Sequence, residues 1–177
     1  MPIFVRTKLQ IHDNCLEPGM PRLSLNYSGP NPQNIYKKIK ELFMSIWNIE
    51  PSEIQEKNFS WDRTGAGEKF NVSWEVVKDL DRFSYMVISV DLSGESKPSK
   101  EFGKEGLADI KIAGAIKTEY PQDTIWQRSL FYEMFRIFYH KVVYQDVRTK
   151  YLQDCNSSIM NFQEEVKSFL NLLPKSY

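Results

Sequence analysis

Residues 108–127, ADIKIAGAIKTEYPQDTIWQ, contain the change of pattern that decides the fold. Apolar and polar residues alternate over 108–117, as they do in a β-strand with one buried face. Pro121 then breaks the extended pattern, and Thr124 with Gln127 three residues later has the form of a helix capping box. The stretch predicts a last strand followed by a C-terminal helical segment, so we expect an α+β fold.

The alternating pattern also recurs upstream, where turn residues bound each run. Residues 83–92 form the most apolar run and suit a central strand, whereas the polar, Gly-containing stretch 94–106 predicts a mobile loop. Thr64–Gly67 suits a hairpin turn, and Gly114 suits a β-bulge. We therefore expect a twisted antiparallel sheet of about six strands, at residues 3–10, 23–27, 54–62, 69–77, 83–92 and 108–117.

Two segments carry apolar residues at helical spacing. The first covers 31–48 and has Pro32 in its first turn. The second, 124–172, contains no Gly or Pro, and as one straight rod it would be about 70 Å long. Because that exceeds the size of a compact domain, we expect a break at Asn156–Ser158. The sheet should thus pack against one helix from the N-terminal half and a long, kinked C-terminal helical segment.

Length and charge indicate one domain over residues 1–177, with 1–123 mainly antiparallel sheet and 124–172 helical. The 23 basic residues equal the 23 acidic ones, which argues against a protein that mainly grips phosphate backbones. We expect nucleic acid as a partner only within a ribonucleoprotein. No apolar run is long enough for a membrane span.

Cysteine usage and the first residues bear on the compartment. Cys15 and Cys155 fit neither a disulfide framework nor a metal-ligand spacing, and the chain does not open with a signal peptide. Abundant Lys, Glu, Ile and Tyr are typical of prokaryotic, archaeal proteins. We therefore expect unpaired cysteines in a cytoplasmic protein.

No motif of an enzyme or of a cofactor site is present. His12, Asp13 and Cys15 lie close in sequence, but an extended segment turns neighbouring side chains apart, so they make a poor nucleophile and base. Two histidines with two unpaired cysteines do not make a zinc site. The sequence therefore predicts no catalytic residue, no metal and no cofactor, and favours a non-enzymatic role.

The helix at 126–144 carries seven aromatic rings in nineteen residues, which is more than one buried stripe needs. A curved sheet that wraps the helix would explain them as core. A sheet that does not quite close would leave a cavity for an apolar small molecule, with a polar group to orient its head. The residues expected to bind such a ligand are Trp126, Phe131, Phe135, Arg136, Phe138, Tyr139 and His140.

A second reading concerns the polar side chains that recur every four residues on the same helix. They form either a solvated face or a contact strip for a protein, a ribonucleoprotein or a second copy of the chain. A projecting C-terminal helix would add a self-association surface. Rings turned inward around a void would favour the ligand, and rings turned outward would favour the partner. The residues of this strip are Arg128, Tyr132, Arg136, His140, Tyr144 and Arg148.

The order of the expected elements resembles the helix-grip layout of START and Bet v 1-like proteins. It runs from an N-terminal strand through the helix at 31–48 and a series of antiparallel strands to a long C-terminal helix. In that family a curved sheet clasps the last helix around an apolar cavity. The resemblance implies that the rings of 126–144 face such a cavity.

Overall fold

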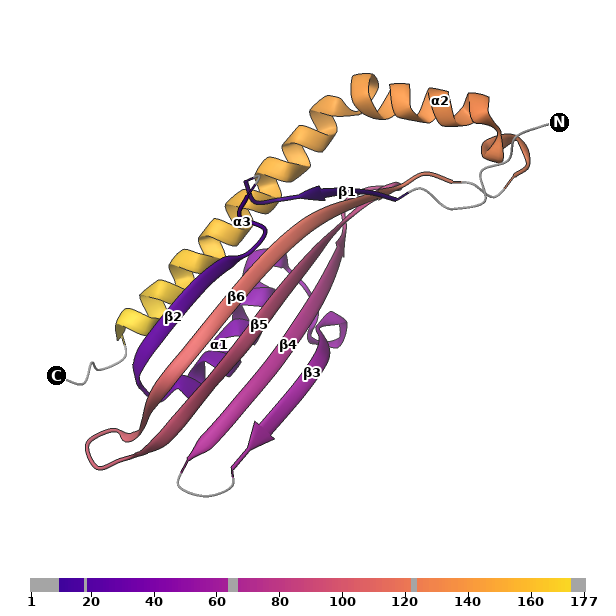
Figure 1. Cartoon of the computed structure of the whole chain (residues 1–177). Coiled ribbons are helices and arrows are strands. Elements are labelled where there is room, and N and C mark those ends of the chain that lie inside the picture. Colours follow the sequence, from indigo (N-terminus) through magenta and orange to yellow (C-terminus); the bar gives the residue numbers. More distant parts are fainter. Residues whose placement is uncertain (1–9, 18, 64–66, 122–123, 173–177) are drawn as a thin grey trace.

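The computed structural model describes residues 10–17, 19–63, 67–121 and 124–172 (Figure 1). Within these residues, six strands form one antiparallel sheet, so the expected α+β class is confirmed. Strands β3 to β6 pair in chain order, and β1 and β2 both pair with the free edge of β6. The strands are β1 (Gln10–Asn14), β2 (Leu23–Pro30), β3 (Gln55–Asp62), β4 (Glu68–Asp79), β5 (Ser84–Ser99) and β6 (Gly103–Glu119).

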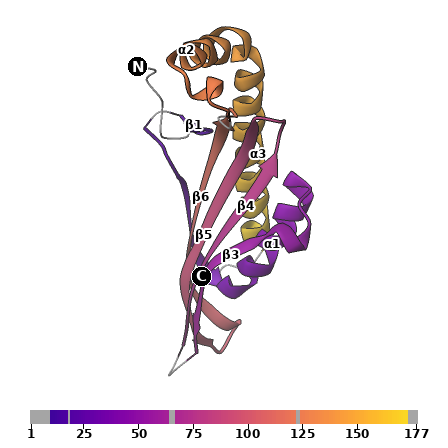
Figure 2. The same ribbon diagram turned by 90° about the vertical axis from the view of Figure 1, so that its right-hand side faces the viewer.

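The two longest helices cover the same face of the sheet (Figure 2). They are α1 (Ile35–Trp47) and α3 (Gln145–Leu172), and their rings meet at Phe43 and Phe162, whose centroids lie 6.3 Å apart. Every second residue of β4 faces them, which explains why its alternation was readable from the sequence. Phe162 is fully buried, so the C-terminal helix packs back on its own chain and does not project.

The stretch 94–106 is not a loop, so that prediction was wrong. β5 continues to Ser99, β6 begins at Gly103, and only residues 100–102 turn. The glycines that suggested a loop serve close packing instead: a Cβ on Gly94 would lie 2.5 Å from the Phe70 ring, and one on Gly106 would meet the backbone of Glu95.

The break in the C-terminal segment also lies elsewhere than expected. Asn156–Ser158 is inside the continuous helix α3. The chain bends instead at a π-helical turn, Tyr139–Val143, between α3 and α2 (Leu130–Phe138). A π-turn holds one extra residue, and such an insertion interrupts the regular helical ladder without any Gly or Pro.

Two further expectations about single residues were wrong. Cys15 and Cys155 form a disulfide that joins the end of β1 to α3. The pairing removes one ground for a cytoplasmic location, because disulfides persist mainly in oxidising compartments. Gly114 is not a bulge: it pairs in regular register with Ile88, and its missing side chain leaves room for Ile159 of α3.

Candidate functional site

Helix α2 lies beyond one end of the sheet and crosses the direction of the strands (Figure 1). The expected capping box before it is present: the Thr124 backbone N–H donates to Gln127 Oε1 over 3.0 Å, and the Gln127 N–H donates to Thr124 Oγ1 over 3.3 Å. This box opens a single 3₁₀ turn at Trp126–Arg128. Ser129 then caps α2 itself and accepts the N–H of Tyr132.

The burial of α2 and the following π-turn is inverted relative to an ordinary amphipathic helix. Arg136 is 4% exposed and His140 is 5% exposed, although both are polar. Phe131 is 74% exposed and Phe135 is 69% exposed. We call the exposed apolar surface of this segment the ring face; it comprises Ile125, Trp126, Leu130, Phe131, Met134, Phe135, Ile137, Phe138, Tyr139, Val142 and Val143.

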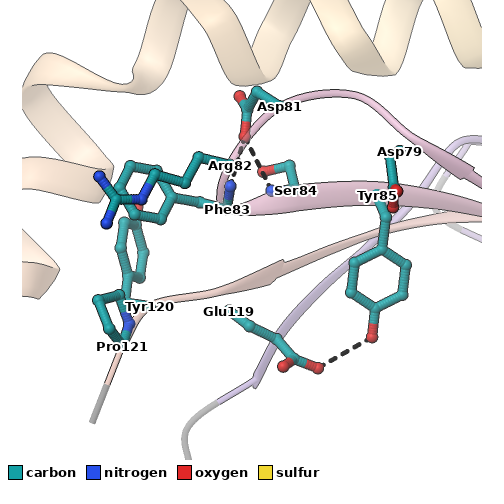
Figure 3. Close-up of a pocket in the computed structure, with 9 residues that line it drawn as sticks. All are labelled: Asp79, Asp81, Arg82, Phe83, Ser84, Tyr85, Glu119, Tyr120 and Pro121. Carbon is teal, nitrogen blue, oxygen red and sulfur yellow. Dashed lines mark hydrogen bonds between the residues drawn. The ribbon is translucent and has the colours of Figure 1, made fainter. Parts of the chain in front are cut away.

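Asp81, in the turn between β4 and β5, explains why the polar side of the segment faces inward. Its Oδ2 accepts the Tyr144 hydroxyl over 2.6 Å and the Tyr151 hydroxyl over 3.0 Å. Its Oδ1 accepts the backbone N–H groups of Phe83 and Ser84 over 2.7 and 2.9 Å (Figure 3). Burial alone would raise the pKa of Asp81, but these hydrogen bonds outweigh it and hold the pKa below its ordinary value.

The Tyr144 hydroxyl also contacts the end of the sheet, at β5 and β6. Its hydroxyl lies 2.7 Å from Ser84 Oγ, which lies 2.9 Å from Thr118 Oγ1. Because the Tyr144 proton goes to Asp81, Ser84 donates to Tyr144 and accepts from Thr118. Burial raises the pKa of Tyr144, so the hydroxyl keeps its proton at neutral pH. The chain of hydroxyls fixes the start of α3 to β5 and β6.

A second polar pair joins the π-turn to the end of β6. The hydroxyl of Tyr120 lies 3.0 Å from Nδ1 of His140. Burial raises the pKa of Tyr120 to about 12, so its hydroxyl keeps its proton at neutral pH, and the tautomer of His140 decides which of the two atoms donates. Burial, with the nearby charges of Arg148 and Lys141, lowers the pKa of His140 despite the opposite effect of Asp13. His140 is therefore neutral in the folded protein at pH 7.

Arg136 is the least satisfied group of the segment. Its Nη2 donates to Glu133 Oε1 one turn earlier. Its Nε and Nη1 are buried and have no hydrogen-bond partner among the residues that the structure describes, and the same holds for His140 Nε2. A buried guanidinium normally uses more of its five N–H groups, so this one retains unused capacity for an acceptor.

A bidentate ion pair fixes the segment on its other side. Arg148 Nε and Nη2 donate to Oδ2 and Oδ1 of Asp13, each over 2.6 Å. Asp13 precedes the disulfide by two residues, so β1, α3 and the π-turn are tied together within a short stretch.

Two hollows lie at this end of the sheet. A polar one of about 440 Å³ lies over the end of the sheet and is lined by both acidic and basic groups, among them Asp81, Arg82 and Glu119 (Figure 3). An apolar groove of about 290 Å³ lies between α2 and the strand ends. Its lining residues are Phe83, Tyr120, Pro121, Tyr132, Phe135, Arg136 and Tyr139.

The structure separates the residues that the sequence grouped as ligand-binding. Phe135, Arg136 and Tyr139 line the groove. Phe135 and Tyr139 also belong to the exposed ring face, Trp126, Phe131 and Phe138 belong to the ring face alone, and His140 is buried against Tyr120. The sheet does not wrap α2, so these seven side chains do not enclose one cavity between sheet and helix.

The polar strip expected to meet a partner points largely into the molecule. Arg136, His140 and Tyr144 are buried, Tyr132 and Arg148 are half-buried, and Arg128 is exposed. Sequence reasoning missed Asp81, Ser84 and Tyr120, which hold the strip. The spacing of four residues predicted the polar strip. Its hydrogen-bond partners could not be predicted, because they lie far from the strip in the sequence.

Among the described residues, no group of His, Cys, Asp and Glu side chains could hold a metal ion. Cys15 is in the disulfide and Asp13 is paired with Arg148, so the stretch around His12 holds no thiol nucleophile. None of the helices in the described part of the chain is both long and apolar enough to cross a membrane.

No protein-family model matches this chain. No curated protein matches it either. A delta-endotoxin structure is similar over 68% of this chain, with 8% sequence identity and a TM-score of 0.31. This chain spans about 64% of the length of that structure. A likeness at this level carries no argument about fold or activity.

Proposed function

We propose that this chain is a non-enzymatic docking protein whose ring face attaches to an apolar surface outside the chain. The observation that carries the proposal is the inverted burial of α2, with Phe131 74% exposed and Arg136 4% exposed. Scattered exposed apolar residues are ordinary, but a contiguous patch of this kind marks an interaction site. Each such side chain gains about 1.5–3 kcal/mol when it moves from water into an apolar environment.

The contacts of the buried side support the outward orientation of the rings. Turning α2 over would bring Phe131 and Phe135 inward, but it would expose the hydrogen-bonded groups of Arg136 and His140 and break the His140–Tyr120 contact. Tyr120 would remain buried without its partner, and an unsatisfied buried polar group costs about 1–3 kcal/mol. These contacts therefore keep the rings of α2 in contact with water, and only a surface outside the chain can cover them.

A double substitution tests the proposal. Phe131→Gln/Phe135→Gln removes two rings that touch solvent, so the melting temperature should stay within a few degrees of the original. Binding of the fluorescent dye anilinonaphthalene sulfonate, which reports exposed apolar surface, should fall severalfold. Phe59→Gln is the matched control, because Phe59 is 53% exposed but lies on β3. A large loss of stability in the double variant, or unchanged dye binding, would contradict the proposal.

A second candidate function rests on the groove beside α2. An apolar small molecule with an anionic head could lay its tail on Phe135 and Tyr139 and offer an acceptor to the unused Nε and Nη1 of Arg136. Solvent extraction of purified protein followed by mass spectrometry tests it. An organic acid that is extracted in stoichiometric amount from the unsubstituted chain, and not from Arg136→Gln, would support this role. An extract without any bound small molecule would contradict it.

A further inference from the structure

We infer that the surface on which the ring face docks is that of an anionic phospholipid bilayer. The inference rests on the proposed docking function and names its partner. Three features of the described residues favour a bilayer over a protein groove: the shape of the tip, the width of the apolar arc and the charge around it.

We call the end of the molecule formed by α2 and the π-turn the tip. Its shape suits a broad, deformable surface. α2 lies crosswise at one end of the molecule and leads away from the sheet (Figures 1 and 2). The ring face is therefore carried at one end of the described part of the chain, on a helix that stands beyond the end of the sheet. A protein partner would need a groove complementary in shape to this helix, whereas the lipid chains of a fluid bilayer adapt to its shape.

The apolar arc is wide enough for the helix to sink into the interface. With 100° between successive residues, positions from Ile137 through Met134 and Phe131 to Tyr139 cover about 200° of the circumference. Lys141 is the one charged side chain that projects within this arc among the described residues. The segment is too short to cross a bilayer, which agrees with the absence of any spanning helix in the described part of the chain. It would lie in the plane of the membrane, at the boundary of headgroups and acyl chains.

Side chains around the arc match an anionic headgroup layer. Trp126 stands at one end of the ring face and Tyr139 near the other, and both residue types favour the membrane–water interface. Between Ile125 and Lys150, where every residue is described, Lys141 and Lys150 are exposed and basic beside the ring face, against one exposed acidic residue, Asp146. Glu133 is already paired with Arg136. The charge at the tip is therefore positive, although the whole chain is balanced.

Co-sedimentation of the full chain with vesicles tests this inference. Vesicles of phosphatidylglycerol and phosphatidylcholine should bind the original chain, and vesicles of phosphatidylcholine alone should bind it severalfold less. Phe131→Gln/Phe135→Gln should lower the partition coefficient at least tenfold, and Phe59→Gln should leave it unchanged. Lys141→Glu should weaken binding to the anionic vesicles several-fold, because a basic group near the surface is lost and an acidic one gained. Lys37→Glu, an exposed charge change on α1, is its control and should have no effect.

The outcomes separate this inference from the proposed function. Dye binding at the ring face without any binding to either vesicle would overturn the bilayer and leave docking on a protein or a second copy, which light scattering detects. Vesicle binding that is equal in the double phenylalanine variant would also overturn it. If the unsubstituted chain binds neither the dye nor either kind of vesicle, the inference and the proposed function are both overturned.

Discussion

At the scale of single residues, a few polar contacts determine which way α2 faces. Tyr144 reaches Asp81 and Ser84, His140 meets Tyr120, and Arg148 holds Asp13. Each contact joins the helical segment to a strand end or a turn of the sheet. The polar side is therefore the attached side, and the rings are left outside.

Tyr144→Phe should destabilise the protein, because it leaves the partly buried Asp81 carboxylate without its shortest hydrogen bond. Loss of a hydrogen bond to a charged group costs about 1.5–3 kcal/mol in the free energy of unfolding, which urea denaturation measures. Tyr139→Phe is the matched control on the same segment, since Tyr139 is 41% exposed, and it should be close to neutral. Equal stabilities of the two variants would show that the Tyr144 hydroxyl does not anchor the segment.

His140 should make stability depend on pH between neutrality and pH 5. Its pKa in the folded protein lies below its ordinary value of 6.5, so the unfolded chain takes up the proton first as the pH falls. The free energy of unfolding should therefore decrease from pH 6.5 down to the folded pKa and level off below it. In His140→Gln this decrease should be absent. Thermal melts of both proteins from pH 7.5 to 5 check this, and a parallel decline in the two would exclude His140 as its source.

The identity of this row was readable from the sequence, whereas its orientation was not. Spacing of four residues places Tyr132, Arg136, His140 and Tyr144 on one side of a helix whatever that side faces. The general rule that polar sides face water predicts the opposite orientation. What overrides the rule is the acceptor Asp81 and its neighbours, which the turn between β4 and β5 brings to the end of the sheet.

At the scale of elements, a change of direction and a close approach shape the C-terminal half. The π-turn Tyr139–Val143 redirects the chain between α2 and α3, and α3 then lies against β6. The approach to β6 is possible because Gly114 has no side chain: a Cβ there would lie 2.6 Å from Ile159 Cδ1 and 3.2 Å from Cys155 Sγ.

Gly114→Ala should therefore be destabilising by about 1–3 kcal/mol, the usual cost of overpacking a filled core. The added methyl group must displace Ile159 and the disulfide from β6. Ala113→Ser is the control, since Ala113 is the neighbouring residue on the other face of the same strand. Denaturant unfolding measures both, and a neutral or stabilised Gly114→Ala would mean that α3 does not lie this close to β6.

Element types were more readable from the sequence than their limits. Alternation found β2, β4, β5 and β6 because one face of the sheet is buried under α1 and α3. It also found β3, although no residue of that edge strand is fully buried. The predicted strand at 3–10 falls mainly outside the described residues, which begin with β1 at Gln10. Glycine was misread at Gly94 and at Gly114, where it packs against a neighbouring side chain, because sequence alone does not distinguish close approach from a turn.

At the scale of the whole molecule, one covalent link ties the beginning of the described chain to its last helix. The disulfide between Cys15 and Cys155 spans 140 residues and lies in the core between β6 and α3. A covalent link that closes a loop of this length strongly reduces the conformational entropy of the unfolded chain.

Cys15→Ala/Cys155→Ala should lower the free energy of unfolding by about 4–5 kcal/mol on the loop-entropy estimate, plus the cost of lost packing. The same loss should follow when the original chain unfolds in the presence of a reductant. An intact mass lower by two hydrogens than that of the reduced chain shows that the bond has formed. Equal stability with and without reductant would contradict a structural role for it.

Docking through the tip is a property of the whole molecule, since it requires the sheet, α3 and the disulfide to present α2 outward. Hydroxyl-radical footprinting, read by mass spectrometry on dilute protein without vesicles, tests that presentation most directly. With α2 facing outward, Phe131, Phe135 and Phe138 should be oxidised far faster than the buried Phe43 and Phe162. Protection of the three α2 rings to the level of Phe43 would mean that they are covered by the chain itself, and the docking surface would not exist.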